Sequence, residues 1–586
     1  MNARRFLLVD QNIRASGGHF LELASVILSA AEEQGYEPWL VTNSAFKGAD
    51  NVRNSWTVRS VFSHFKMQRW SLTAYGHSRV ARDGKGRPEM SGLQSILQVI
   101  KDRIYQVRPE VMLDDFATEL VPVLKEFKPT DNDQILFATC DDFCALAIAE
   151  AFRRADLPGS VDLHILSHAS FLEQRECEWA AKKCNSPHFA QQIALTRKNL
   201  LPHRVHFWAT TEELARQLNW VAGVPLWASV CYPVRNGLSP MKRDSPVPRR
   251  ILLGGAIRSE KGLSRIAKLV GHLWDTHLES GRWQIAMQVP ENLHSSVLPR
   301  NLLSKVAEWA ELGDKAPVIL SAGHLDSESY ERMLQTADLG LFLYDGRRYY
   351  TRCSGVLVEM LACGIPVIVP AASWLSRQIA PAHDRYLRNV ECQFGKRVCI
   401  HEKQLTLPVH QRAAYTLMVA VPSPGLTRIA VTLGETKEYD YLAVEVCSLA
   451  KDGRTIRSDL RILECSVIGP TQFLVNTQMN ASSLKICLWS PYPQRPISLR
   501  RIELFHSDDS NISGPVSSLG LTDSGTSSIS QNIDEIEDHY SHYRDSAMQY
   551  ADAWRSRHAG NALVETLKRD RRCSASAEVE LCRVTE

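Results

Sequence analysis

Residues 352–367 read RCSGVLVEMLACGIPV, and this stretch decides the fold class. Ser354 stands where a helix N-cap is favoured, and a largely apolar run follows it up to Ala362. Gly364 and Pro366 then end the predicted helix, and Val367 begins a short apolar run that is typical of a buried strand. The same breaks argue against a membrane-spanning helix over this apolar window. A helix followed at once by a buried strand indicates part of a parallel α/β sheet.

The alternation of short apolar runs with amphipathic stretches extends towards the N-terminus. It predicts strands, with helices between them, at residues 6–9, 38–42, 134–139, 161–167 and 206–210. Prolines and charges at 245–250 indicate a hinge, after which the pattern restarts. We therefore predict an α/β protein with two Rossmann-like domains, residues 1–243 and 249–390.

The pattern changes in the C-terminal half. From about residue 411 to 505, short segments rich in Val, Ile and Leu alternate with turn residues, which is typical of an antiparallel β-sandwich. We predict an inserted sandwich at 405–508 and a flexible linker, dense in Ser, Gly and Asp, at 509–531. Helical periodicity then predicts terminal helices at 532–567 and a frayed tail at 568–586.

Composition limits the classes of partner. Lys plus Arg number 68 against 65 for Asp plus Glu, a formal net charge of +3. A chain with so little net charge has no overall electrostatic field that would attract nucleic acid or an anionic membrane. Any recognition of phosphate must therefore be local. The 14 cysteines are scattered and show no zinc-ligand spacing. We interpret them as thiols in a reducing compartment rather than as a disulfide framework.

The sequence also bears on location and metal binding. The apolar run at 6–9 is stopped by Asp10 and is too short for a secretory signal, so we predict a cytoplasmic protein, or one peripheral to the inner face of the membrane, with no transmembrane segment. Asp131 and Asp133 flank Asn132 in a DxD-like pattern, but the pattern precedes an apolar strand and is typical of a turn. We predict neither a metal nor a cofactor.

The first candidate anion-binding loop lies between the first predicted strand and helix, at Gly17, Gly18 and His19. Glycines let backbone approach a ligand closely, and a helix N-terminus supplies free N–H groups. A tight turn without a ligand is the alternative.

The second loop follows the strand at 250–253 and contains Arg258 and Lys261. Both are cations at a helix entrance, where the helix dipole favours anions. A bound phosphate would reverse that penalty, and a solvated charge cluster is the alternative.

The third loop is the opening stretch itself. With Ser354 as N-cap, the free N–H groups of Gly355 and Val356 could hold a phosphate. Glu359 lies among apolar residues and is costly to bury unless it accepts hydrogen bonds, for which ligand hydroxyls are suitable donors. A structural pairing of Glu359 with Lys or Arg is the alternative.

These residues resemble glycosyltransferases of family four, a retaining group with the GT-B fold. Glu359 and residues 362–367 match the second glutamate and the tail of the family's Glu-x7-Glu signature, which continues as small-Gly-x-Pro-Val. The family's Gly-Arg-x-x-x-Glu-Lys-Gly loop is matched at Gly255, Glu260, Lys261 and Gly262. The Gly17-Gly18-His19 loop is similar to its first glycine loop, so the resemblance spans roughly residues 4–380 and the final helices.

The resemblance implies metal-independent transfer of a sugar, with retention of configuration, from a UDP- or GDP-sugar to a glycan, lipid-linked or other hydroxyl acceptor, as in polysaccharide biosynthesis. Glu359 would accept hydrogen bonds from ribose hydroxyls, and Lys261 would neutralise the leaving diphosphate, which amides near Ser354 would cradle. His168 fits the family's strand-end histidine facing the sugar, with His164 on the same strand face as a second candidate.

Two positions depart from the family pattern. Thr351 stands where the first glutamate is expected, and Ala256 where the loop arginine is expected. Arg258 or Arg352 could supply the missing guanidinium, since either could bind a phosphate bidentately. The departures favour an alternative of another class, a non-catalytic GT-B-like protein that binds glycan or nucleotide and recruits partners. The sandwich could bind a glycan acceptor or a partner through exposed aromatic residues such as Trp489, Tyr492 and Phe505, or serve as a packing or spacer module.

Overall fold

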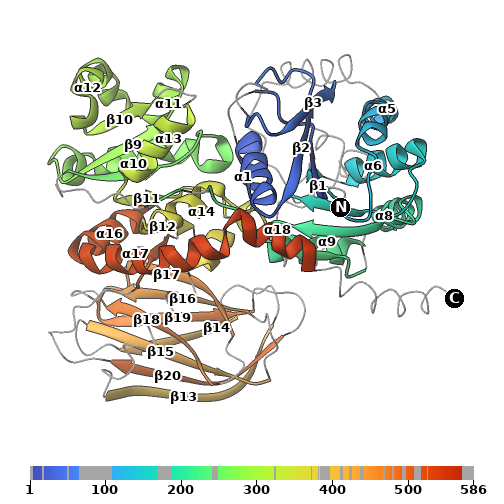
Figure 1. Cartoon of the computed structure of the whole chain (residues 1–586). Helices are drawn as coiled ribbons and strands as arrows, with labels where there is room; N and C mark the ends of the chain where they lie inside the picture. The colour runs from blue at the N-terminus through green and yellow to red at the C-terminus, as the bar shows by residue number, and fades with distance from the viewer. Residues whose placement is uncertain are drawn as a thin grey trace, which may run out of the picture. The chain divides into compact units, whose positions relative to one another are not determined.

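The chain divides into two compact units in the computed structural model (Figure 1). The first runs to Asn236 and resumes from His558, and the second is built mainly from Gly237–Arg557. The structure describes residues 4–15, 19–48, 52–64, 109–140, 142–168, 187–222, 224–235, 237–239, 248–321, 325–346, 348–370, 373–379, 382, 396–408, 414–420, 425–435, 441–465, 469–477, 481–490, 496–506, 517–523 and 526–569.

A parallel sheet of seven strands forms the centre of the first unit, in the order β3-β2-β1-β4-β5-β6-β7. The strands are β1 (Arg4–Asp10), β2 (Tyr36–Asn43), β3 (Thr57–Phe62), β4 (Gln134–Cys140), β5 (Asp162–Ser167), β6 (Arg204–Ala209) and β7 (Trp227–Ser229). The helices are α1 (His19–Glu33), α5 (Pro109–Phe127), α6 (Asp142–Ala155), α8 (Pro187–Asn199), α9 (Glu212–Ala222) and α18 (Gly560–Arg569).

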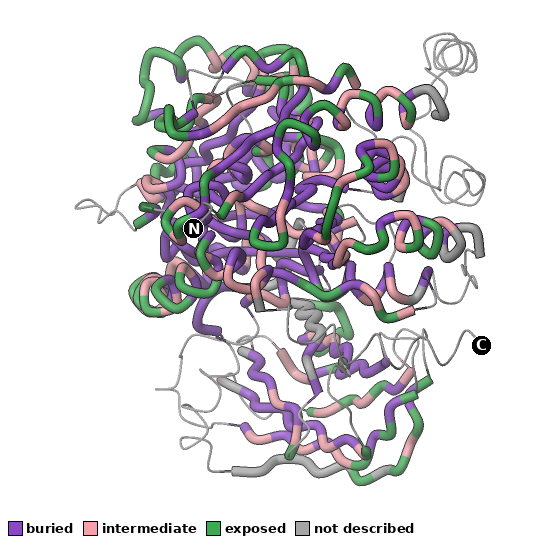
Figure 2. The backbone as a smooth tube through the Cα atoms, turned by 45° about the vertical axis from the view of Figure 1, so that its right-hand side comes forward, coloured by how far each residue is buried: buried purple, intermediate pink, exposed green. Residues whose placement is uncertain are grey.

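Alternation along the strands divides the first unit's interior into two apolar layers. Leu7 and Val9 of β1 join a cluster with α5, α6, α8 and α9. Phe6 and Leu8 point to the other face, into a cluster with α1 and α18. Burial on both faces is what a parallel sheet requires, and Figure 2 shows these strands buried along most of their length.

A second parallel sheet, ordered β10-β9-β8-β11-β12-β21, organises the second unit. Its strands are β8 (Arg249–Leu253), β9 (Trp283–Gln288), β10 (Val318–Ser321), β11 (Leu339–Leu341), β12 (Val367–Pro370) and β21 (Gly520–Asp523). The helices are α10 (Leu263–Leu273), α11 (His294–Val297), α12 (Val306–Leu312), α13 (Ser327–Gln335), α14 (Gly355–Ala362), α16 (Thr526–Asp538) and α17 (Tyr540–Arg557). A 3₁₀ turn, Ser259–Lys261, connects β8 to α10.

The C-terminal half also contains the predicted antiparallel sandwich. One sheet is ordered β13-β20-β15-β18 and the other β14-β19-β16-β17. The strands are β13 (Lys396–Leu407), β14 (Tyr415–Ala420), β15 (Gly425–Leu433), β16 (Tyr441–Leu449), β17 (Thr455–Glu464), β18 (Thr471–Thr477), β19 (Ser483–Trp489) and β20 (Ile497–His506). The fold class, two Rossmann-like domains with an inserted antiparallel sandwich, is therefore confirmed.

The sandwich is an insertion between two neighbouring strands of the second sheet. β12 precedes it and β21 follows it, yet the two strands pair in parallel, with Val367 opposite Gly520. A Cβ on Gly520 would lie 2.1 Å from the Val367 carbonyl oxygen, so only glycine permits this approach.

Three expectations about this half differ from the structure. The stretch 509–531, predicted as a flexible linker, contains β21 and the start of α16, and β13 begins at Lys396, before the predicted sandwich boundary at 405. The aromatic surface is also not as expected, because Trp489 is only 7% exposed. Phe505 is half-buried under the Arg428 guanidinium, and Tyr492 lies outside the described residues.

Candidate functional site

The loop after β8 holds Lys261 against the first turn of α14. A Cβ on Gly254 would lie 2.5 Å from Val356 Cγ1. A Cβ on Gly255, whose φ is +75°, would lie 2.8 Å from Lys261 Nζ and 3.0 Å from Val356 Cγ2. Because glycine has no Cβ, these two residues let the loop pack closely against both the Lys261 side chain and the first turn of α14.

The ammonium group of Lys261 is kept in an unfavourable environment for a charge. Burial and the neighbouring Arg258 lower its pKa to about 8, against the opposite influence of Glu260 and Glu359. Nζ lies 5.4 Å from the centre of the Tyr344 ring, within range of a cation–π interaction. Burial raises the pKa of Tyr344 well above its usual value, so the phenol is neutral.

The N-terminus of α14 faces the same place. Ser354 adopts extended backbone angles, φ −127° and ψ 109°, and its side chain accepts a hydrogen bond from the Leu357 N–H at 3.3 Å. As the first two residues of the helix, Gly355 and Val356 have N–H groups without intrahelical acceptors. The positive end of the helix dipole thus points towards a lysine, which is an arrangement suited to an anion.

Glu359 completes this group one turn further along α14. Its Oε2 accepts a hydrogen bond from the Tyr330 hydroxyl of α13 at 2.8 Å, and the side chain is half-buried. The carboxylate also acts on the pKa of Lys261 and Tyr344. Val356, which adjoins Lys261 at Gly255, precedes Glu359 by three residues on α14, so a ligand phosphate at Lys261 and a ligand hydroxyl at Glu359 would be neighbours along the helix.

The arginine candidates lie beside this group. The Arg258 side chain is 66% exposed and pairs with Glu260 at 3.8 Å. Arg352 is half-buried and acts on the pKa of Tyr349. Thr351 is only 1% exposed, so the residue in the place of the family's first glutamate is packed inside the protein. Whether either arginine replaces the missing guanidinium stays a prediction.

His168 lies in the first unit, directly after β5. Its Nε2 is 2.6 Å from the Ala138 carbonyl oxygen, which can only accept, so Nε2 carries the proton. Burial and the neighbouring His19 lower the pKa of His168 to about 4. The ring is therefore neutral near pH 7 and offers Nδ1 as an acceptor for a hydroxyl group.

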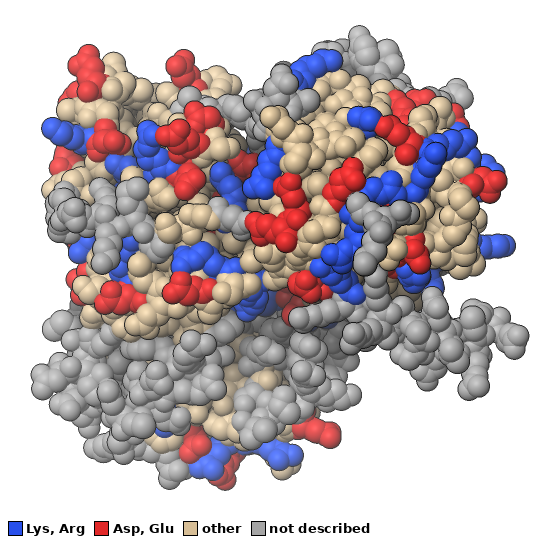
Figure 3. All heavy atoms as spheres, viewed as in Figure 1, with Lys and Arg blue, Asp and Glu red and all other residues tan. Residues whose placement is uncertain are grey.

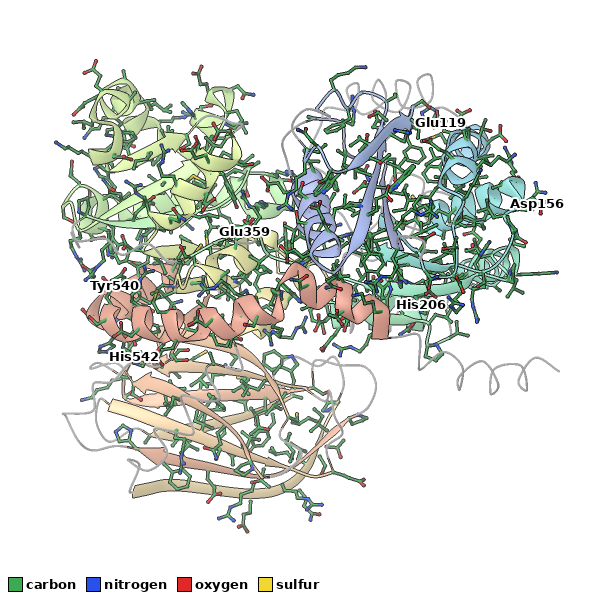
Figure 4. All side chains as sticks on the ribbon, in the orientation of Figure 1. Glu119, Asp156, His206, Glu359, Tyr540 and His542 are labelled. Carbon is green, nitrogen blue, oxygen red and sulfur yellow. The ribbon has the colours of Figure 1, made fainter. Side chains whose placement is uncertain are left out.

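His164, the second candidate, is enclosed by other side chains of the first unit. It is fully buried, its Nδ1 accepts from the Trp208 indole at 3.0 Å, and its Nε2 bonds to the Gln134 side-chain oxygen at 2.6 Å. Its ring stacks on that of His206, which Figure 4 labels at the lower edge of the first unit. Of the two histidine candidates, only His168 stands at the end of its strand.

The structure describes only part of the first glycine loop. Gly17 and Gly18 lie outside the described residues, and His19 is exposed at the start of α1. Asp133 of the DxD-like pattern is buried and binds Arg5 at 2.6 Å and the Thr130 N–H at 2.8 Å, which makes it part of a turn.

Surface charge, metal-binding clusters and membrane-spanning helices are the remaining features that bear on the sequence predictions. Within the described parts of the chain, no cluster of three or more His, Cys, Asp or Glu residues could hold a metal ion. In the same parts no helix has the length and apolar character needed to cross a membrane. Figure 3 shows basic and acidic side chains interspersed on the viewed face of the described residues.

The sequence prediction missed the tyrosines of the site. Tyr344 follows β11. Because ligands of parallel sheets bind beyond the carboxyl ends of the strands, this position could have indicated that Tyr344 belongs to the site. Tyr330 had no such signal, because nothing local links α13 to Glu359.

No family of known proteins matches this sequence, and no curated protein does. Among solved structures, it is similar to one described as trehalose-6-phosphate from E. coli bound with UDP-2-fluoro glucose, at 12% identity and a TM-score of 0.39, covering 64% of this chain and 86% of that one. A UDP-forming trehalose-phosphate synthase from Burkholderia vietnamiensis gives 11% and 0.36, covering 64% and 86%. A glycosyltransferase from Rickettsia africae gives 11% and 0.35, covering 63% and 79%. These scores are too low to transfer a fold or a function.

Proposed function

We propose that the protein is a glycosyltransferase that takes a sugar from a nucleoside-diphosphate sugar and passes it to a hydroxyl group of a glycan or other acceptor. The observation that carries the proposal is electrostatic. A mostly buried ammonium, Lys261, lies against the positive end of α14, and a diphosphate is the ligand that would relieve both.

The groups described in the second unit then each have a role in sugar transfer. Lys261 and the first N–H groups of α14 would stabilise the negative charge that grows on the departing diphosphate. Glu359 would accept hydrogen bonds from the ribose hydroxyls. Because the protein supplies this positive charge itself, we propose a reaction without a metal and, from the family resemblance, with retention of configuration.

From the family resemblance, we propose that His168 of the first unit serves the sugar side of the reaction. Its neutral ring presents Nδ1 as an acceptor for a hydroxyl of the transferred sugar or of the acceptor. A neutral histidine suits this role, since a cation there would oppose the positive charge that develops at the anomeric carbon.

A second candidate function rests on Thr351. This buried threonine stands in place of a glutamate, which favours a non-catalytic protein that binds a nucleotide or glycan and recruits partners through the sandwich.

Thermal unfolding with and without nucleotides tests the proposal. UDP or GDP at 100 times its dissociation constant is expected to stabilise the protein by about 2.7 kcal/mol. Product analysis after incubation with a panel of nucleotide sugars then separates the enzyme from the binding protein. Failure of every nucleoside diphosphate to raise the melting temperature would contradict the proposal.

Affinity for the nucleoside diphosphate is expected to weaken as the pH rises through about 8. Burial holds the pKa of Lys261 at about 8 in the free protein, and a diphosphate beside it favours the charged ammonium and raises that pKa in the complex. Binding above pH 8 must therefore restore a lost proton, and the dissociation constant rises by up to about tenfold per pH unit. Calorimetric titrations between about pH 7 and 9.5 measure this dependence.

Lys261→Arg is the matched control, because a guanidinium stays charged over this whole range. It should flatten the profile, whatever its effect on the affinity at pH 7. A wild-type profile that is already flat above pH 8 would show that Lys261 does not contact the diphosphate.

A further inference from the structure

Tyr330 reaches Glu359 from a different helix. Its hydroxyl is the donor and Glu359 Oε2 the acceptor, at 2.8 Å, because a carboxylate can only accept. The start of α13 is itself fixed, since the Asp326 side chain accepts from the Ser329 N–H at 2.7 Å and caps the helix. Tyr330 also donates its own N–H to the Asp326 carbonyl at 3.0 Å. The phenol is therefore held on a well-anchored first turn.

This contact decides how Glu359 presents its carboxylate. A glutamate has several rotatable bonds, and fixing one oxygen with a rigid phenol removes most of that freedom before a ligand arrives. Both side chains are half-buried, so the pair remains accessible to a ligand. A Cβ on Gly255 would meet both Lys261 Nζ and Val356, and Glu359 follows Val356 by three residues on α14, so the carboxylate lies on the helix face beside the proposed diphosphate position.

We propose that Tyr330 is a positioning residue that orients Glu359 to accept hydrogen bonds from ribose hydroxyls, so that the site selects ribonucleoside diphosphates over their 2′-deoxy forms. This inference rests on the proposed function and deepens it. Loss of one hydrogen bond between a hydroxyl and a charged acceptor weakens binding by about tenfold or more. The ratio of the two dissociation constants, deoxy over ribo, therefore reports how well Glu359 is oriented.

The experiment measures that ratio for UDP, GDP and ADP with the wild-type protein, Tyr330→Phe and Tyr540→Phe. Tyr540→Phe is the matched control, because the Tyr540 hydroxyl likewise donates to a carboxylate, Asp338 Oδ1, at 2.8 Å. Figure 4 shows Tyr540 and Glu359 well separated in the second unit. The affinity for inorganic pyrophosphate is measured in parallel as a probe of the diphosphate position alone.

For the preferred nucleotide, the wild-type protein and Tyr540→Phe are expected to give a ratio of about ten or more. Tyr330→Phe should bring it close to one while pyrophosphate affinity stays the same. Glu359→Ala should abolish the ratio too, and adding Tyr330→Phe to it should change nothing further. If Tyr330→Phe is unstable, Glu359→Ala alone keeps the test available, because a ratio that Glu359→Ala leaves unchanged would also overturn the inference.

An unchanged ratio in Tyr330→Phe, or an equal loss in Tyr540→Phe, would overturn the inference. A wild-type protein that binds a diphosphate nucleotide tightly with a ratio near one would also overturn it, while leaving the proposed function intact. If the wild-type protein binds none of the three nucleotides, the proposed function fails, and the inference falls with it.

Discussion

Replacing Lys261 by alanine is expected to lower the rate of sugar transfer by about 100-fold or more, with little effect on folding. Removal of one preorganised group that stabilises a developing negative charge commonly costs a factor of about 10²–10³ in turnover. The lowered pKa of about 8 shows that the charged ammonium is not well stabilised in the free protein. Removing it should therefore change the free energy of unfolding by no more than about 1 kcal/mol.

The measurements are the transfer rate under saturating donor, the affinity for the free nucleoside diphosphate and the melting temperature. Lys268→Ala is the matched control, because Lys268 is exposed on α10 in the same unit. It should leave all three values at the wild-type level. If Lys261→Ala lost stability and activity together, the lysine would be structural and the proposed anion site would be wrong.

Replacing Gly262 by alanine is expected to destabilise the second unit by about 3–5 kcal/mol. Gly262 ends the turn that contains Lys261 and has a φ of +87°, where other residues are strained. A Cβ there would also lie 2.2 Å from the Leu343 carbonyl oxygen. The carbonyl oxygen is a backbone atom of the residue before Tyr344, so the clash can be relieved only if the loop that contains Lys261 moves away from Tyr344.

Gly281→Ala separates the cost of the positive φ from the cost of the steric clash. Gly281 has a similar φ of +72°, but a Cβ there would meet nothing within 4 Å. It should lose only the conformational part, about 1–2 kcal/mol. Denaturant unfolding compares the stabilities, and nucleotide titration should show a weakened site in Gly262→Ala alone. Equal losses in both variants would mean that contact with Leu343 does not hold the loop.

Much of the fold follows from local pattern. The run from Ser354 to Val367 contains its own helix start, helix stop and strand, so the structure forms α14 and β12 where the residues indicate. Strand periodicity likewise predicted the sandwich. β21 escaped prediction because its four residues, Gly520–Asp523, lie in a Ser- and Gly-rich stretch. It becomes a strand by pairing with β12, which is distant in sequence.

Residue chemistry therefore determined by itself that the chain forms two parallel α/β sheets and a sandwich, and it marked Lys261, Ser354 and Glu359 as candidates. Only the tertiary structure decided which residues surround them. It brought Tyr344 under Lys261 and Tyr330 onto Glu359, buried Trp489, and separated His164 from the strand-end His168. The physical reason is that periodicity and capping act within a few turns of chain, whereas these contacts arise from packing between elements that the sequence keeps apart.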